Sequence, residues 1–472
     1  MELKIWQERI KHTQSNMDFY SFILNIASWR PIVLTKRQGR ITRYWDSDRV
    51  KYCDYKDFNE NRDDLVKFGL DYKFKLNFFQ NFQKVFSTVK LPNLLQFATN
   101  ENADFADEVL WSKNVYLSSA VAGGCENVLY SLWVRSNCKN VFSSSIIWNN
   151  SENVYLSAGV ISGFNIFYSK YILDSNNIWF CSNLVWCSEC IMCNWLKNKS
   201  YCIDNKEYSK EDYLIEKKKI LSQKDEFEQK YLDMISRTQE QDKFIIDCEN
   251  ITNSHYVFNT RNWNNLILAW WVKESQDLFN VFSCSGGSQD CVNIMGLGAA
   301  NNVYNSCNIW LSSNIYYSYF LEWCTYCLGC VWLKNKSYCI LNKQYTEEDR
   351  YKLVEQIFEH MENQWILWEF FPGYLNPFYF NDTIAFLINH DINKEEATFK
   401  WFLWRDEEIK VDIPAGLEVV KIWDLNKYQW FNADWKWNIN PEILKKVIKD
   451  EKWDIYRIVN MEYEFLKKYE LP

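Results

Sequence analysis

Two groups of four cysteines have the same spacing, Cys-x2-Cys-x2-Cys-x8-Cys, at two places in the chain. Four thiolates can close a tetrahedral zinc site, and cysteine clusters in cytosolic proteins are commonly metal sites. The pattern therefore makes zinc the first candidate cofactor. The candidate ligands are Cys187, Cys190, Cys193 and Cys202 in the first group and Cys324, Cys327, Cys330 and Cys339 in the second.

The same cysteines also follow a 12-residue period, which gives a second interpretation. Cys190 and Cys202 lie 12 residues apart, as do Cys327 and Cys339. Free cysteine is among the most buried residue types, so thiols at a fixed period can form a packed internal row. The x8 gap fits neither a ferredoxin run nor a zinc ribbon. We therefore favour packing as the role of these cysteines and keep zinc binding as the alternative.

Both clusters belong to a repeat of 12 or 13 residues that begins with Asn or Asp followed by a small apolar residue. Apolar runs followed by Ser, Asn and Gly favour a short strand and a turn in each repeat. A short fixed period is typical of stacked arrays. The repeat starts are Asn114-Val115, Asn127-Val128, Asn140-Val141, Asn153-Val154, Asn165-Ile166 and Asn177-Ile178 in one block, and Asn265-Leu266, Asp277-Leu278, Asp290-Cys291, Asn302-Val303 and Asn314-Ile315 in another.

The two blocks are copies of one another. Residues 186–212 realign with residues 323–349 at an offset of 137 residues. We therefore predict a mainly β fold: a duplicated β-solenoid of 12-residue repeats, with helical insertions and a small α+β C-terminal region. The period fits one repeat per narrow coil as well as two repeats per wide coil of about 25 residues.

This reading divides the chain into five regions. An irregular N-terminal region covers 1–110, the first block 111–208, a helical connector 209–250, the second block 251–345, and a helix with the small α+β region 346–472.

Helix starts are predicted directly after each block. Ser209 and Thr346 are each followed three residues later by an acidic residue, which is the form of a capping box. The first helical stretch is predicted to run to about residue 244 and the second to about residue 363. A further helix is predicted over residues 78–86.

The tryptophan content is anomalous. The chain has 24 Trp and only 13 Gly in 472 residues, whereas glycine usually makes up about 7% of a protein. Several tryptophans stand where a turn favours glycine. We infer that the source organism reads UGA as glycine. The sites expected to be glycine include Trp148, Trp186, Trp195, Trp323, Trp332, Trp435 and Trp453, whereas Trp179 and Trp404 are expected to be genuine.

Charge and hydropathy exclude several classes of protein. The net charge of -8 disfavours nucleic acid as a partner, because phosphate binding needs a basic face. The N-terminal residues are charged, and no run of 18 uncharged apolar residues occurs. We therefore expect a cytoplasmic protein with no membrane partner.

Three segments, LKNKSYCILNKQYT with its upstream Cys-x-x-Cys-x-x-Cys, FFPGYLNPF and IYRIVNMEYEFLKKYELP, resemble an uncharacterised family of large proteins from reduced-genome bacteria. The resemblance covers most of the chain from about residue 45. It implies that the tryptophan of VWLKNKSYC is ordinarily glycine. It also implies zinc-ribbon cysteine pairs near both ends, from which this chain departs, since its N-terminal region has only Cys53.

Some members of that family are labelled as class III CoA-transferases, called CaiB/BaiF. The chain shows neither the α/β alternation nor a nucleotide-binding segment that such chemistry needs. We expect instead a noncatalytic scaffold or binding protein for a protein or carbohydrate partner, with zinc binding and CoA transfer as alternatives. Repeat tyrosines could stack on sugars or bases, although their register favours core or face positions. These are Tyr116, Tyr155, Tyr304 and Tyr316.

Overall fold

The computed structural model divides into two compact units, which are described separately below. Unit 1 comprises Met1–Leu94 and Gln241–Glu407, and unit 2 comprises Leu95–Glu240 and Glu408–Pro472. The structure is rich in strands (35%), with long parallel sheets, and has 32% helix. The described residues are 20, 24–37, 40–44, 49–96, 99–239, 244–246, 256–258, 268–270, 280–282, 293–295, 300–367, 369–406, 413, 416–432, 436–450 and 455–472.

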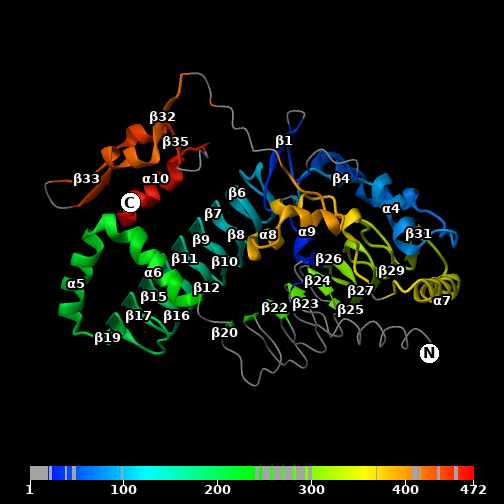
Figure 1. The fold of residues 1–472 in the computed structure, drawn as a ribbon, viewed down its shortest axis with the longest axis horizontal. Coiled ribbons are helices and arrows are strands. Elements are labelled where there is room, and N and C mark those ends of the chain that lie inside the picture. The colour runs from blue at the N-terminus through cyan, green and yellow to red at the C-terminus, as the bar shows by residue number, and fades with distance from the viewer. Residues whose placement is uncertain are drawn as a thin grey trace. The chain divides into compact units, whose positions relative to one another are not determined.

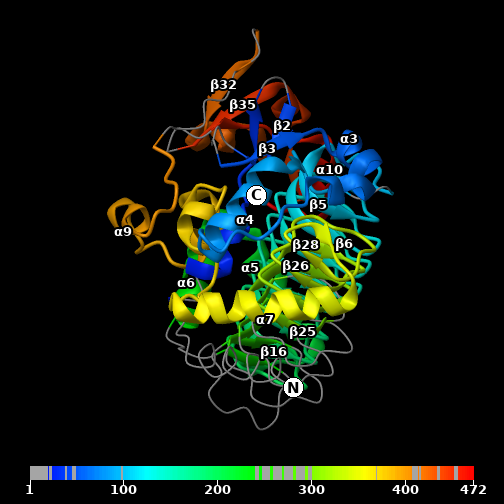
Figure 2. The same cartoon turned by 90° about the vertical axis from the view of Figure 1, so that its right-hand side faces the viewer.

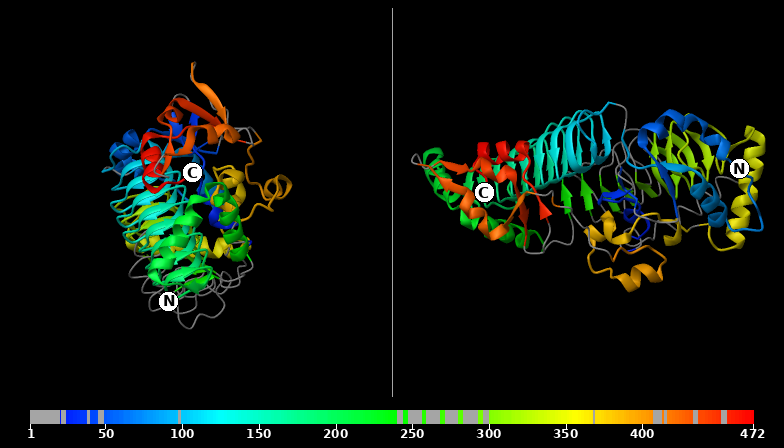
Figure 3. Two further views of the ribbon diagram at one scale, coloured as in Figure 1. Left: turned by 90° about the vertical axis from the view of Figure 1, so that its left-hand side faces the viewer. Right: turned by 90° about the horizontal axis from the view of Figure 1, so that it is seen from above.

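Unit 2 contains a 15-stranded sheet, coloured cyan to green in Figure 1 and seen from above in Figure 3. All its pairs are parallel except the last, β18 with β19. The strands are β5 (Phe105–Leu110), β6 (Lys113–Ala122), β7 (Glu126–Leu129), β8 (Leu132–Arg135), β9 (Lys139–Phe142), β10 (Ser145–Trp148), β11 (Glu152–Tyr155), β12 (Ala158–Ile161), β13 (Phe164–Phe167), β14 (Lys170–Leu173), β15 (Asn176–Trp179), β16 (Ser182–Val185), β17 (Ser188–Ile191), β18 (Ser200–Ile203) and β19 (Lys206–Glu207).

Most strands from β7 onward pair with the strand two places further along the chain. Val141 faces Val154 and Ile166 faces Ile178, so paired residues lie one repeat apart. Each repeat therefore holds two short strands and stacks directly on the next repeat. Paired residues of neighbouring strands are 12 or 13 positions apart in the sequence. Each coil therefore holds one repeat, and the alternative of two repeats per wide coil is not observed in these pairs.

The backbone explains why asparagine marks each repeat. Through this block, nearly every third residue has a positive φ, as at Asn165, Tyr168 and Tyr171. Only glycine visits this left-handed region freely, and Asn is the most tolerant of the other residues. The repeat Asn occupies such a position directly before the buried Val or Ile.

The repeat asparagines form a continuous row of side-chain hydrogen bonds, called the Asn row below. Each Nδ2 donates to the Oδ1 of the next Asn at 2.8–3.0 Å. Asn177 donates instead to Glu189 at 2.8 Å, and Lys217 pairs with Glu189 at 2.6 Å. Every Asn in the row therefore donates toward the next repeat, and the row ends at the Glu189 carboxylate, whose charge Lys217 balances. The Asn row consists of Asn102, Asn114, Asn127, Asn140, Asn153, Asn165 and Asn177.

Asn140→Gly is expected to lower the free energy of unfolding by about 1–2 kcal/mol, because it removes the acceptor of the Asn127 amide N–H and the donor to the Asn153 amide oxygen. Glycine keeps the positive φ of 53°. The matched control is Asn137→Gly, an exposed Asn with φ 58° outside the Asn row. Urea denaturation measures both variants, and equal losses would show that the Asn row adds nothing.

Helices cover the outer face of the unit 2 sheet. Ser209 caps α5 (Lys210–Ser222) by accepting from the Asp212 N–H at 3.1 Å, so the predicted helix start is confirmed. The prediction of one helical stretch to about residue 244 is wrong, because the chain breaks after Ser222 and resumes through η3 (Lys224–Glu226) and α6 (Phe227–Gln239).

A second apolar core lies between the sheet and these helices. Outward-facing side chains of successive repeats, such as Phe142, Phe167 and Trp179, pack with α6 and with α10 (Asn460–Tyr469). Phe142 and Phe465 have ring centroids 4.4 Å apart. The other C-terminal elements of unit 2 are β32 (Glu418–Lys421), η6 (Ile422–Tyr428), β33 (Gln429–Phe431), β34 (Trp437–Ile439), η7 (Pro441–Lys445), β35 (Lys446–Lys449) and β36 (Ile455–Tyr456).

Unit 1 contains the second block, whose strands pair in parallel at the same spacing, except for one antiparallel pair at its end. Val303 faces Ile315, which faces Cys327. The repeat starts at residues 265, 277 and 290 lie outside the described residues. The strands are β20 (Phe244–Ile246), β21 (Tyr256–Phe258), β22 (Leu268–Trp270), β23 (Asn280–Phe282), β24 (Asn293–Met295), β25 (Ala300–Tyr304), β26 (Ser306–Trp310), β27 (Ser312–Tyr316), β28 (Tyr319–Glu322), β29 (Thr325–Leu328), β30 (Cys339–Ile340) and β31 (Lys343–Gln344).

The long helix α7 (Glu347–Asn363), yellow in Figure 2, packs on this block. Thr346 caps it as predicted, and Tyr316 packs against Phe358 with ring centroids 5.5 Å apart. The predicted helix near residue 78 is α4 (Phe78–Thr88). The other elements are η1 (Ala27–Trp29), β1 (Thr35–Arg37), β2 (Arg40–Thr42), β3 (Lys51–Cys53), α3 (Tyr55–Asn61), η2 (Arg62–Phe68), β4 (Lys90–Pro92), η4 (Gly373–Leu375), η5 (Phe380–Asp382), α8 (Ile384–Ile388) and α9 (Lys394–Phe399).

Many tryptophans have the left-handed backbone that favours glycine. Trp365 and Trp401 directly follow the C-caps of α7 and α9. At each of these helix ends, the N–H groups of the tryptophan and of the next residue donate to carbonyls of the last helical turn. Glycine is the usual residue at such a position. Trp148, Trp179 and Trp404 have no positive φ, and residues 435 and 453 lie outside the described residues. The tryptophans with positive φ are Trp111, Trp133, Trp186, Trp195, Trp323, Trp332, Trp365 and Trp401.

Candidate functional site

All eight candidate cysteines lie in the interior of the repeat blocks. Each side chain is at most 1% exposed. The first four belong to the same apolar core as the stacked valines and isoleucines of unit 2. These cysteines are therefore positioned by the strands and corners of the last repeats, before the chain enters α5 and α7.

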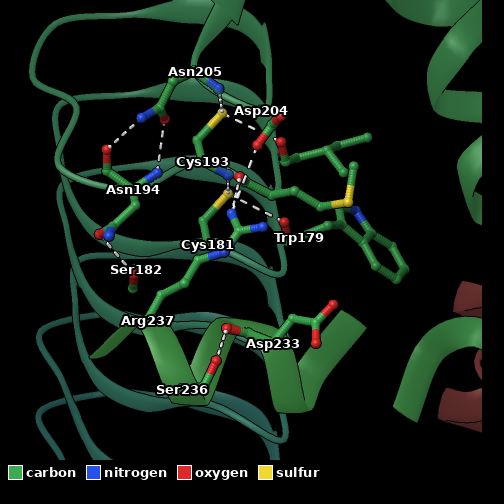
Figure 4. A network of polar contacts seen from close by, with 12 residues as sticks. Trp179, Cys181, Ser182, Cys193, Asn194, Asp204, Asn205, Asp233, Ser236 and Arg237 are labelled. Atoms are coloured by element: carbon green, nitrogen blue, oxygen red, sulfur yellow. Dashed lines mark hydrogen bonds and ion pairs between the residues drawn. The ribbon is translucent and has the colours of Figure 1, made fainter. Parts of the chain in front are cut away.

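Four of these cysteines, two in each unit, stand where earlier repeats have serine. The Ser169 hydroxyl accepts from the Cys181 N–H at 3.1 Å. Cys181 Sγ accepts from the Cys193 N–H at 3.2 Å, and Cys193 Sγ accepts from the Asn205 N–H at 3.4 Å (Figure 4). In unit 1, Cys330 takes the corresponding place between Ser318 and Asn342. At these repeat corners, serine hydroxyls accept the backbone N–H bonds in the earlier repeats, and cysteine sulfurs accept them in the last repeats.

Other cysteines replace the buried Val or Ile. Cys190 faces Ile178 on one side and Cys202 on the other, and Cys327 faces Ile315. The remaining corner positions are Cys187, whose N–H donates to the Ser175 hydroxyl at 2.9 Å, and Cys324, whose N–H donates to the Ser312 hydroxyl at 2.9 Å. The 12-residue period of the cysteines is therefore the period of the internal rows.

The thiols of each cluster also interact with one another. Cys190 is hydrogen-bonded to Cys187 and Cys193, and these bonds together with burial raise the pKa of Cys190. Hydrogen bonds from Cys181 and Cys190 lower the pKa of Cys193. In unit 1, a hydrogen bond with Cys327 and burial raise the pKa of Cys324. Among the described residues, no three Cys, His, Asp or Glu side chains form a group that could hold a metal ion.

Purified protein is expected to carry no stoichiometric zinc. The cysteine sulfurs already accept backbone N–H bonds at the repeat corners or pack in the apolar core. Elemental analysis of protein purified without chelators measures the metal content. Treatment with EDTA should leave the melting temperature unchanged, since a structural zinc site contributes about 10–16 kcal/mol and its loss is visible. Two zinc ions per chain with EDTA-sensitive melting would instead support the alternative that the eight cysteines are ligands.

Arg350 lies beside the second cluster, and nothing in the sequence pattern indicated it. It holds the position on α7 that Tyr213 holds on α5, and it is fully buried. Its guanidinium lies over Tyr326 and Tyr351 at 5.7 and 5.2 Å, and its three nitrogens have no hydrogen-bond partner among the described residues. Burial lowers the pKa of Arg350, while the nearby Tyr316 and Cys327 act in the opposite direction.

Glu462 on α10 is a second titratable residue that no sequence pattern indicated. Its carboxylate accepts hydrogen bonds from the Val459 N–H and the Tyr130 hydroxyl. Burial nevertheless raises the pKa of Glu462 to about 7. The group therefore changes charge near neutral pH inside unit 2.

The repeat tyrosines occupy packed positions in both units. Tyr304 and Tyr316 are fully buried, with ring centroids 5.4 Å apart, and Tyr155 packs on Tyr168. Tyr116 borders a cavity together with Tyr130, and the two ring centroids lie 6.0 Å apart. All four tyrosines therefore lie at core or face positions, as their register indicated.

Within the described ranges, no helix is long and apolar enough to cross a bilayer. Comparison of the chain with protein-family models, with curated proteins and with solved structures finds no match.

Proposed function

We propose that the chain is a noncatalytic scaffold or binding protein whose two repeat blocks are β-solenoids, and that the Asn row forms its binding face for a protein or carbohydrate partner. The observation that carries this proposal is the unbroken series of six Asn-to-Asn hydrogen bonds along unit 2. Neighbouring strands lie about 4.8 Å apart, so the amides repeat at that interval. Repeat proteins use such extended surfaces for binding.

The charges beside the Asn row also suit an extended polar partner. Lys113 pairs with Glu101 at 3.2 Å, and Glu126, Lys139 and Glu152 follow in successive neighbouring strands. Opposite charges thus alternate from repeat to repeat and leave no strong net field. Each amide still has a second N–H and a second oxygen lone pair. A hydroxyl-rich or peptide partner can use these groups at every member of the row except Asn153, which is buried.

A steric block on this face tests the proposal. Lys139→Trp puts a large side chain beside the Asn row at an exposed position, and Lys218→Trp puts the same side chain on the exposed face of α5 as the control. We expect Lys139→Trp alone to reduce binding at least tenfold on an array of oligosaccharides and peptides. Binding that survives Lys139→Trp, or that both variants lose equally, contradicts this assignment of the face.

A further inference from the structure

Unit 2 contains a cavity of about 650 Å³ at the start of its first block. Tyr116 and Leu117 on β6 and Tyr130 just after β7 form one wall. Ile413 and the elements from η7 to the first residues of α10 form the other wall. Further along the block, the outward side chains are covered by packed helices, as Phe142 is by Phe465. This volume lies within the range of about 300–1,000 Å³ that is usual for small-molecule sites.

Most of the lining is apolar. Leu444, Val447, Ile455 and Ile458 line the cavity opposite Tyr116. Leu117 is 49% exposed, so the cavity has an entrance beside this side chain. Such walls favour a ligand with an apolar body, because its burial removes apolar surface from water.

The polar groups of the cavity gather at one end and favour an anion. Arg457 lines the cavity, and its Nη2 donates to the Leu444 carbonyl at 2.9 Å, which holds the guanidinium in place. Val459 and Asn460, at the N-terminus of the ten-residue helix α10, also line it. The side chain of the N-cap residue Val459 makes no capping bond, and the Glu462 carboxyl bonds to the Val459 N–H. A helix N-terminus carries partial positive charge.

We propose that this cavity binds an amphipathic carboxylic acid, with its apolar body against Tyr116 and Val447 and its carboxylate between Arg457 and the start of α10. The proposal concerns a different surface from the Asn row and stands independently of it. Glu462 is also close to this end, since it bonds to Tyr130 and to Val459. Its carboxyl is partly neutral at neutral pH, which limits repulsion of a bound carboxylate.

Calorimetric titration of the full chain with decanoate, decanol and decylamine tests the charge of the ligand. Decanoate is expected to bind at least tenfold more tightly than the other two, because hydrogen bonds to a charged group are stronger than neutral ones. Arg457→Gln should weaken decanoate about tenfold and leave decanol unchanged. Equal binding of all three probes, or tighter binding of decylamine, overturns the proposal, as does the absence of decanoate binding.

A variant that fills the entrance tests the location. Leu117→Trp should abolish decanoate binding. The matched control is Leu311→Trp in unit 1, which changes an exposed Leu with nearly the same φ, 45° against 43°. Decanoate binding that both variants retain overturns the assignment to this cavity. Loss of binding in Leu117→Trp alone supports it.

Discussion

Replacing six exposed tryptophans of positive φ by glycine is expected to raise the free energy of unfolding by about 4–6 kcal/mol, summed over the two units. A left-handed backbone costs a non-glycine residue about 1 kcal/mol or more. Exposed side chains lose little packing, although Trp186 also gives up a contact with Lys197. Urea denaturation measures the change. The six are Trp111, Trp186, Trp195, Trp323, Trp365 and Trp401.

Trp179→Gly is the matched control, with an expected loss of about 3–5 kcal/mol. Trp179 has no positive φ, is 6% exposed, and stacks on Phe167 with ring centroids 4.3 Å apart. A gain in the six-site variant together with a loss at Trp179 separates backbone strain from side-chain packing. Destabilisation of the six-site variant would contradict the prediction.

These positions bear on the genetic code of the source organism. We propose that the codons of the six exposed tryptophans are UGA and are translated as glycine, which sequencing of the coding DNA tests directly. UGG codons would contradict the proposal. The sequence pattern selected Trp186, Trp195 and Trp323 but missed Trp365 and Trp401. The end of α7 near residue 363 was predicted, but the left-handed backbone of Trp365 just after it was not.

Trp332 shows that a positive φ alone does not decide whether a tryptophan stands at a glycine position. Its φ is 59°, as expected for a glycine position, yet its ring is 2% exposed and stacks on Phe320 at 3.7 Å. Trp148, which the sequence also assigned to glycine, is buried in extended β10. The structure gives no backbone reason for glycine there.

The internal rows could be predicted from the sequence because stacking places identical positions on one another. The period alone put Cys190 on Cys202, and their register agrees. The same holds for the Asn positions. Asn tolerates the positive φ there, and its side chain bonds to the Asn one repeat away, so both requirements favour Asn. Helix starts were equally local, since Ser209 needs only the N–H of Asp212.

The outer surface could not be predicted in this way. Phe142 meets Phe465, which lies more than 300 residues away in the sequence, so no period links them. Arg350 on α7 looks like an ordinary helix-surface residue until its burial over Tyr326 is known. Glu462 likewise depends on Tyr130 from a distant strand corner. Contacts between the repeats and the C-terminal elements are specific to this chain and carry no repeated signal.

Glu462→Gln is expected to raise the free energy of unfolding of unit 2 by about 3 kcal/mol at pH 8. The folded pKa is about 7 against an ordinary value of 4.5, and each unit of difference corresponds to about 1.4 kcal/mol. A raised folded pKa means that the unfolded chain ionises first. Native Glu462 therefore costs the fold nothing well below pH 4.5, and this cost grows as the pH rises to about 7 and is constant above it.

The gain from Glu462→Gln must follow that pH window if desolvation is its cause. It should be below about 0.5 kcal/mol at pH 4.5 and nearly complete at pH 8. Glutamine still accepts from Tyr130 and Val459, so the substitution removes the charge and keeps the bonds. Exposed Glu464 on the same helix is the control, and Glu464→Gln should change little at either pH. A gain that is equal at both pH values would mean that packing, rather than ionisation of a buried carboxyl, sets the effect.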